Sequence, residues 1–327
     1  MEHIETYLPV LVAPAGHSQQ DSTERPFIQA NTIAATVEEV KQKHIIPVFI
    51  KDNETLISHT DFVEAAMDVA ADIFHGETIL KPSIRLSHPI KGRIPDAKDK
   101  PVHRLEEWEK TLYYERMAFI IEVPTIWETI AGNAVSLTIG GVKSYSLDNL
   151  YNRKGADEHF KVFVGFQNKV CTNLCVNTDG VLLDLKVKSL AQLSGCIRTM
   201  LSQYNMPYHL HSLKDLTNYA ITEQQFAQLV GRCRMYPYLP QQARNEIPQL
   251  LFGDTQIGTV VRDFYRDGSF GTAGDGLLDL WRMYNLFTGA NKSTYIDQFV
   301  ERGVNAFSFA HSVKAALQSN SYNWYLS

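Results

Sequence analysis

Two cysteines four positions apart are the first residues whose type and spacing could support chemistry. Cys171 and Cys175 lie in the segment VCTNLCVNTDG, residues 170–180. Cysteine pairs are common zinc ligands, with Zn–S bonds of about 2.3 Å. Four residues of a strand span about 13 Å, so in a strand the two thiols lie too far apart to bind one ion. We therefore interpret the cysteines as structural and expect neither a metal site nor a cofactor.

The triplet Asp184-Leu185-Lys186 offers a second chemistry. An acidic residue followed two positions later by a lysine on a strand is typical of metal-dependent nucleases, in which a second carboxylate helps to bind the cation. Asp148 and Asp157 are candidates for that carboxylate. Because the pattern is short, a solvated strand face remains the alternative, and no residue is assigned a catalytic role.

Basic side chains form the third candidate site. Residues 1–80 contain 13 acids and 4 bases, a balance of −9, whereas residues 81–104 contain 7 bases and 2 acids, a balance of +5. A basic segment in a chain of net charge −5 can follow a phosphate backbone, and Tyr145 and Phe163 could stack against bases. The predicted nucleic-acid-binding residues are Arg85, Lys91, Arg93, Lys98, Lys100, Arg104, Lys161, Lys169, Lys186 and Lys188.

A predicted hairpin positions the last four of these lysines. Residues 159–177 alternate, with apolar side chains at most even positions and polar side chains at most odd positions, which is typical of a half-buried strand. Asp179-Gly180 is a strong two-residue turn signal. A turn at this dipeptide pairs Cys175 with Asp184 and places the four lysines on one polar face. Solvated strands also carry lysines, so the alternative interpretation is an ordinary solvent-exposed face without a binding role.

The remaining pattern predicts an α+β fold. We expect strands at 44–50, 117–124 and 134–146, and a short strand followed by an exposed, proline-containing loop over 84–101. Apolar residues at helical spacing predict helices at 58–74, 103–116, 189–204, 222–236, 257–267, 276–287 and 293–317. Because strands come first and helices follow, we expect an antiparallel sheet, mainly residues 80–190, with a mostly helical C-terminal half packed on it.

Length and composition bound the organisation of the chain. It has 327 residues, of which 44% are hydrophobic and 20% charged, enough for a full core. We expect a flexible extension at residues 1–30 and a single α+β domain at residues 31–327, β-rich over 31–188 and helical over 189–327. No leader pattern and no apolar run of about 18 residues is present, and four cysteines do not make a disulfide framework. A cytoplasmic protein without membrane contact is therefore expected.

Several long segments carry a resemblance to a known family. They include ISHTDFVEA, IRLSHPIKGRIP, FKVFVGFQNKVCTNLCVNTDG and LWRMYNLFTGANKSTYIDQF. After about residue 30, the chain resembles a Bacteroidetes family of unknown function, domain of unknown function family 3871. VCTNLC and LWRMYNLFTGANKS are also similar to the phage- and plasmid-like family of unknown function 932. The resemblance implies no catalytic residue; it implies the cargo of mobile elements, a setting that favours proteins which handle DNA.

Three alternative functions are compatible with these residues. The first is a non-enzymatic nucleic-acid-binding protein of a mobile element that favours single-stranded DNA, with a homo-oligomer as one option. The second is a metal-dependent nuclease that uses Asp184 and Lys186. The third is a protein–protein adaptor, such as an inhibitor of a host enzyme, in which the acidic first 80 residues make the contact. C-terminal helices packed over the lysine-bearing sheet face would weaken the first alternative.

Overall fold

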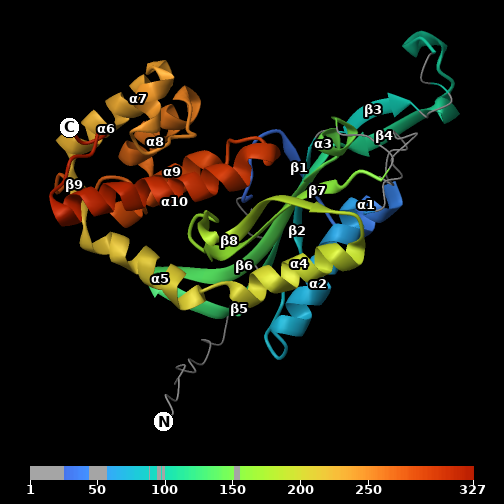
Figure 1. Cartoon of the computed structure of the whole chain (residues 1–327), viewed down its shortest axis with the longest axis horizontal. Coiled ribbons are helices and arrows are strands. Elements are labelled where there is room, and N and C mark those ends of the chain that lie inside the picture. The colour runs from blue at the N-terminus through green and yellow to red at the C-terminus, as the bar shows by residue number, and fades with distance from the viewer. Residues whose placement is uncertain (1–25, 44–56, 88, 94–96, 98–99, 151–154) are drawn as a thin grey trace.

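A six-stranded sheet lies at the centre of the computed structural model, which describes residues 26–43, 57–87, 89–93, 97, 100–150 and 155–327. The strand order is β1-β2-β5-β6-β7-β8, and every neighbouring pair is antiparallel (Figure 1). These strands are β1 (Thr32–Ala35), β2 (Ser83–Ser87), β5 (Arg116–Ile130), β6 (Asn133–Ser144), β7 (Glu158–Asn168) and β8 (Leu174–Val187). The expected α+β fold with an antiparallel sheet is confirmed.

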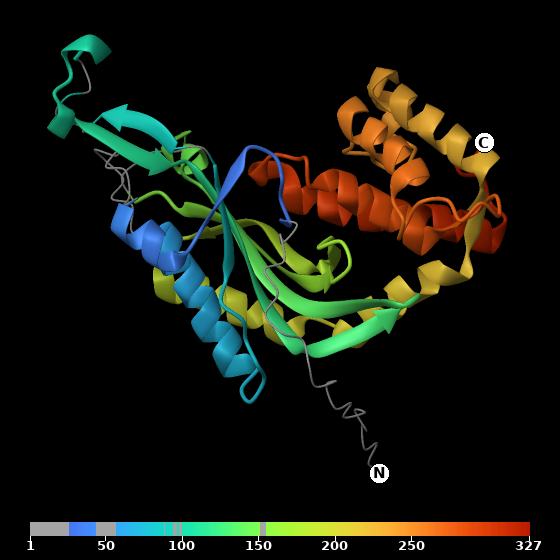
Figure 2. The same ribbon diagram turned by 180° about the vertical axis from the view of Figure 1, so that it is seen from behind.

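Helices cover both faces of this sheet (Figures 1 and 2). α2 (His59–Ile73) and α4 (Leu190–Gln203) pack against each other on one face, and α10 (Ile296–Ser319) lies on the other. An apolar cluster between the sheet and the first half of α10 includes Phe163, Val176 and Phe299. The sheet face that the strand alternation leaves to solvent is therefore largely covered by a C-terminal helix, and the sheet-face part of the nucleic-acid-binding alternative is weakened accordingly.

The start of α2 shows how local sequence sets an element. Ser58 accepts a hydrogen bond from the Asp61 N–H at 3.0 Å, and the Asp61 carboxylate accepts one from the Ser58 N–H at 2.8 Å, which is a capping box. Phe62 then packs edge-on against Phe119 in the sheet, with ring centroids 5.0 Å apart. A Cβ at Gly141 would lie 2.3 Å from the Phe62 ring, so glycine at that position allows the helix to approach the sheet.

The C-terminal half supplies the other helices. They are α5 (Met206–Asp215), α6 (Glu223–Met235), α7 (Gln241–Asn245), α8 (Asp254–Arg266) and α9 (Leu280–Asn291), with a two-stranded sheet of β9 (Ala220–Thr222) and β10 (Leu277–Asp279). A capping box of Thr222 and Gln225 opens α6, at the start of the helix predicted over 222–236. In both views α6, α7 and α8 gather at one end of the molecule. Within the described ranges, no helix combines the length and the apolar character that a membrane span requires.

The connection between β7 and β8 differs from the predicted hairpin. Phe166 pairs with Cys175 and Phe160 with Leu185, so the chain turns at residues 169–173. Residues 177–180, which contain the Asp-Gly dipeptide, form an irregularity inside β8. The turn is fixed from outside: Lys292 Nζ donates to the carbonyl of Cys171 and to Thr172 Oγ1. Because Lys292 is 120 residues further along the chain than Thr172, a local turn pattern could not reveal this contact.

A second two-stranded sheet projects from the body as an arm (Figures 1 and 2). β3 (Pro89–Arg93) pairs with β4 (Lys110–Tyr114), and 3₁₀ turns at Val102–Arg104 and Glu107–Glu109 lie between them. We call the described residues 89–93, 97 and 100–114 the arm. The predicted helix over 103–116 is wrong, because the second half of that segment pairs as β4. The strand predicted at 44–50 lies outside the described residues.

Two short helices complete the chain, α1 (Val37–Lys43) and α3 (Tyr145–Leu150). α3 follows directly on β6, close to the base of the arm, where the Tyr145 N–H donates to the Glu115 carbonyl at 2.9 Å. At the N-terminal side, Phe27 and Ile28 are buried in the apolar cluster under α10. The division into an extension at 1–30 and one domain at 31–327 stays a prediction, since residues 1–25 lie outside the described ranges.

Candidate nucleic-acid interface

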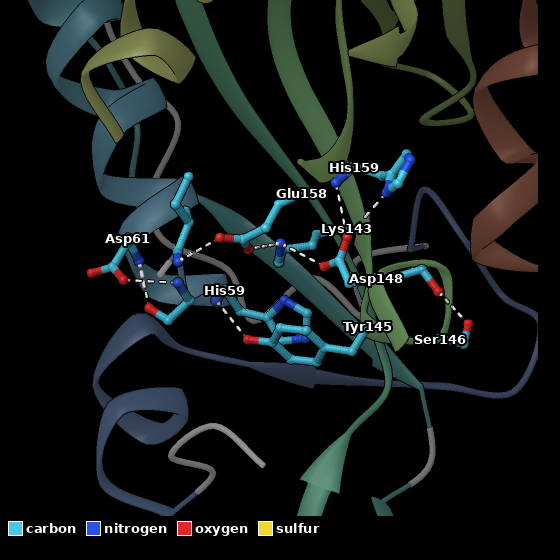
Figure 3. A network of polar contacts seen from close by, with 11 residues as sticks. His59, Asp61, Lys143, Tyr145, Ser146, Asp148, Glu158 and His159 are labelled. Carbon is cyan, nitrogen blue, oxygen red and sulfur yellow. Dashed lines mark hydrogen bonds and ion pairs between the residues drawn. The ribbon is translucent and has the colours of Figure 1, made fainter. Parts of the chain in front are cut away.

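A buried lysine organises the end of the sheet from which the arm projects (Figure 3). Lys143, near the end of β6, is fully buried, and its Nζ lies 3.0 Å from Asp148 Oδ2 and 2.7 Å from Glu158 Oε2. The same ammonium lies 3.9 Å from the centroid of the Phe160 ring. One cation between two buried carboxylates is stable only when each oxygen has a partner.

The remaining carboxylate oxygens do have partners. Asp148 Oδ1 accepts a hydrogen bond from the His159 N–H at 2.8 Å and lies 3.3 Å from His159 Nδ1. Glu158 Oε1 accepts from the Ile57 N–H at 3.1 Å. The network therefore joins β6, α3, β7 and the segment before α2 at one point.

Tyr145 extends this network toward α2. Its hydroxyl accepts a hydrogen bond from the His59 N–H at 3.2 Å, and the two rings stack with centroids 4.2 Å apart (Figure 3). Burial raises the pKa of the Tyr145 hydroxyl far above its usual value. Tyr145 and Phe163 are both buried, so the expectation that they stack against bases is wrong.

An open cleft of about 520 Å³ lies beside the network. Its walls come from the ends of β6 and β8, the start of β7, and the first turn of α10. The polar side chains that line it are Ser144, Asp157, His159, Lys161, Asp184, Lys186 and Asp297. Asp297 also binds Arg116 Nε at 2.5 Å, two residues after the arm ends, so the cleft and the arm adjoin.

Three of the predicted lysines gather around this cleft. Lys161 is mostly buried and is bound by Glu301 and by the carbonyl of Asp297, both on α10. Lys186 pairs with Asp184 at 2.8 Å, and Lys188 lies 3.8 Å from Asp157. Exposed ion pairs of this kind contribute about 0–1 kcal/mol, so a phosphate group can compete for the two outer lysines.

The arm carries the other basic group. Lys91 and Arg93 lie on β3, and Arg104 is exposed on the first 3₁₀ turn. Lys100 pairs with Glu109 at 2.6 Å; the lysine and the backbone of Glu106 hold the pKa of the Glu109 carboxyl below its usual value. Lys98 lies outside the described residues.

Two predicted residues lie away from this interface. Lys169 follows β7 at its far end and bonds to Glu122 at 2.5 Å, about 26 Å along the strand from Lys161 at the usual rise per residue. The half-buried guanidinium of Arg85, on β2, donates to the side chain and the carbonyl of Thr32 in β1. Arg85 therefore joins two strands.

The nuclease pattern does not assemble in the described chain. Asp184 is 73% exposed and pairs with Lys186, whereas Asp148 belongs to the buried network and Asp157 faces Lys188. In the part of the chain that the structure describes, no three His, Cys, Asp or Glu side chains are grouped so that they could bind a metal ion. The four cysteines are free thiols, and burial raises the pKa of Cys175 and Cys233 well above the usual value.

Sequence patterns missed several residues of the interface. Lys143, Glu158 and His159 were not predicted, although a lysine inside the apolar run VSLTIGGVKSY is a sign of a buried, paired charge. Trp108 was assigned to a helix, yet it is 69% exposed between the arm strands. The segment around Trp108 mixes acidic and basic residues and has no regular hydrophobic spacing. The exposure of this tryptophan could therefore not be inferred from the sequence.

Comparison with known proteins identifies the family of the chain. The family model described as "Domain of unknown function, B. Theta Gene description (DUF3871)" matches residues 12–326. The chain belongs to this family. The match confirms the main resemblance and includes both the arm and the cleft of this DUF3871 chain, while the resemblance to family 932 stays a prediction. No curated protein and no solved structure matches the chain.

Proposed function

We propose that this DUF3871 chain binds nucleic acid, with single-stranded DNA favoured, through the arm and the adjoining cleft. The observation that carries the proposal is the arm itself. It projects from the end of the sheet, contains Lys91, Arg93 and Arg104, and exposes Trp108. The mobile-element setting and a homo-oligomer belong to the same proposal.

The charges on the arm support a phosphate contact. Glu107 and Glu109 are paired with Lys110 and Lys100, at 2.5 Å and 2.6 Å. These two acids are thereby partly neutralised within the arm. Lys186 lines the adjoining cleft, and Lys188 lies 3.8 Å from Asp157, which also lines it. A row of basic side chains releases counterions from a nucleic-acid backbone, and that release drives sequence-independent binding.

The preference for single strands rests on Trp108. A base can stack on an exposed indole ring only when it is not stacked within a duplex, and such a contact contributes about 1–3 kcal/mol per base. Phe163 and Tyr145 are buried, so neither adds a stacking surface to that of Trp108. A narrow arm with an exposed indole ring fits a strand of unpaired bases better than a wide duplex.

Fluorescence anisotropy with labelled single- and double-stranded DNA across a salt series tests the proposal. We expect saturable binding that weakens with salt and is tighter for the single strand. The triple variant Lys91→Gln, Arg93→Gln, Arg104→Gln should lower affinity at least tenfold and reduce the salt slope by about 2. Trp108→Ala should weaken single-strand binding by roughly 5- to 100-fold.

The matched control replaces three bases elsewhere: Lys214→Gln, Arg198→Gln and Arg234→Gln, each of which has an exposed ion pair outside the interface. This control should bind like the natural chain. Equal binding by the arm variant and the natural chain would contradict the proposal. No binding of either DNA at low salt would also contradict it and would favour a protein adaptor that uses Trp108 as its contact.

A further inference from the structure

A second cleft, of about 430 Å³, lies at the other end of β7 and β8. It is bounded by the turn between these strands, by α8 and by α9. This turn contains VCTNLC, and α9 contains most of LWRMYNLFTGANKS, two segments that are more than 100 residues apart in the chain. We call this space the asparagine cleft, after the residues of its floor.

Buried amides form that floor. Asn173 Nδ2 donates to the Asn285 carbonyl at 2.9 Å and to Asn285 Oδ1 at 3.3 Å, and Asn168 Nδ2 donates to the same Oδ1 at 3.3 Å. Asn173 is only 2% exposed, and within the described chain its Oδ1 has no hydrogen-bond donor. A buried acceptor without a donor costs about 1–3 kcal/mol, so this oxygen is suited to an N–H group of a ligand.

Part of the wall is apolar. Phe270 and Leu286 line the cleft, and each is only 2% exposed, so they bound the space without presenting an open stacking face. Gly289 on α9 lines it beside Asn173: a Cβ at position 289 would lie 3.7–3.8 Å from the two polar atoms of the Asn173 amide. The absence of a side chain at position 289 leaves space directly beside this buried amide.

The rim is cationic. Arg262 and Arg266 lie one turn apart on α8, and Lys292 also lines the cleft. Two acids, Asp263 and Asp267, line it as well. Both acids have partners: Asp263 binds Arg262 at 2.8 Å, and Asp267 Oδ1 accepts from two backbone N–H groups. Within the described ranges, no ion pair involves Arg266, whose side chain is exposed. Guanidinium groups bind phosphates in a bidentate manner.

We propose that the asparagine cleft binds a nucleoside monophosphate whose base has an exocyclic amino group. The amino group donates to Asn173 Oδ1, the base lies in the space beside Gly289, bounded by Phe270 and Leu286, and the phosphate binds at Arg266, one turn from Arg262. A zwitterionic amino acid fits less well, because its ammonium would lie among cations whose neighbouring acids are already paired. The inference does not depend on DNA binding by the arm.

Isothermal titration calorimetry of the full chain with adenosine, cytidine and uridine monophosphate and with inorganic phosphate tests this assignment. We expect the two amino-bearing nucleotides to bind about tenfold more tightly than uridine monophosphate, which has a carbonyl in place of the cytidine amino group. Inorganic phosphate should bind most weakly. Equal affinity for all four probes, or no binding up to millimolar concentrations, would overturn the proposal.

Two variants locate the site. Gly289→Ala should reduce nucleotide affinity at least tenfold and leave the melting temperature unchanged or higher, since alanine favours a helix. Arg266→Gln should weaken every phosphate-bearing probe, and the matched control Arg234→Gln, whose side chain pairs with Asp254 outside the cleft, should not. Unaltered binding in Gly289→Ala and Arg266→Gln would place the nucleotide elsewhere. The arm variant should bind nucleotide like the natural chain, so failure of either proposal leaves the other distinguishable.

Discussion

Lys143 illustrates how one residue can connect several elements. Its ammonium is fully buried and bridges Asp148 on α3 and Glu158 on β7. An ion pair at this depth contributes little net stability compared with an apolar replacement, but the loss of one partner leaves the others buried and uncompensated. The residue is therefore more important for the arrangement of β6, α3 and β7 than for the total free energy of unfolding.

Replacement of Lys143 by methionine should lower the free energy of unfolding by about 3–5 kcal/mol, because two carboxylates then lack their cation. Urea denaturation measures this change. The matched control Lys186→Met removes an exposed pair with Asp184 and should change stability by less than about 1 kcal/mol. The additional changes Asp148→Asn and Glu158→Gln should restore part of the loss; equal stability of Lys143→Met and the natural chain would contradict the assignment.

His209 makes the stability of the chain depend on pH. Its ring is fully buried among Phe166, Phe307 and His311, and Tyr204 Oη lies 2.5 Å from its Nδ1. Burial lowers the pKa of His209 from 6.5 to about 3, with a smaller effect from His311, whose own pKa falls to about 4 mainly through burial. The folded chain thus retains neutral imidazoles under conditions that protonate the unfolded chain.

The sign of the pH effect follows from these pKa values. The stabilising contribution of neutral His209 is complete above pH 6.5 and is lost as the pH falls from 6.5 toward 3, since the unfolded state binds the additional proton. At pH 5 the loss amounts to about 2 kcal/mol. His209→Gln should flatten the stability profile over this range in thermal denaturation, whereas His75→Gln, at an exposed position, should not. Parallel profiles for all three proteins would refute this account.

At the scale of elements, local signals succeeded where the stabilising contacts are also local. Helices were predicted to begin at residues 58 and 222, and capping boxes of Ser58 with Asp61 and of Thr222 with Gln225 open α2 and α6, because capping involves residues three positions apart. The β7–β8 turn was misplaced because its stability comes from Lys292 on a distant segment. An Asp-Gly pair expresses only a backbone preference, which tertiary contacts can override.

The arm shows the same limit. We predicted a helix over 103–116, yet Thr111, Leu112 and Tyr113 pair with β3. β-Branched and aromatic residues favour strands. However, β3, the strand with which they pair, lies about 20 residues earlier in the chain, so no local pattern contains both partners. Of the candidate site, sequence therefore located the basic residues of the arm, while the buried network at its base depends on strand pairing that no local pattern contains.

Close packing of the sheet is tested at Gly140 on β6. A Cβ at this position would lie 2.4 Å from the Phe119 carbonyl oxygen, a backbone atom that cannot move without a shift of β5. Gly140→Ala should therefore lower the free energy of unfolding by about 1–3 kcal/mol. The matched change Gly258→Ala on α8 meets no atom within 4 Å and should raise it by about 0.5–1 kcal/mol. Chemical denaturation distinguishes the two, and a neutral Gly140→Ala would contradict the packing described.

At the scale of the whole molecule, α10 joins the two halves of the chain. Its first half packs on the sheet through Phe299 and Val300, and its second half packs among the C-terminal helices through Phe307 and Phe309. A continuous helix transmits the loss of packing at one end to the other. The sheet and the helices should therefore unfold together.

Calorimetry should show one cooperative transition for the natural chain. Phe299→Ala and Phe309→Ala should each shift that same transition to lower temperature, with losses of about 3–5 kcal/mol. Two separate transitions, with each substitution shifting only one of them, would contradict the expected single domain and assign the helices to a unit of their own.

The outer edge of the sheet gives β1 a further importance. β1 is only four residues long, and the N–H groups of Gln29 and Ala30 before it both donate to the Lys292 carbonyl at the end of α9. Without this short strand, β2 would present unpaired N–H and C=O groups to solvent, next to the apolar surface that Phe27 and Ile28 now cover. Such an edge accepts strands from other chains. The segment from 27 to 35 thus protects the molecule from aggregation, and its release would convert a well-folded chain into one that associates with its own copies.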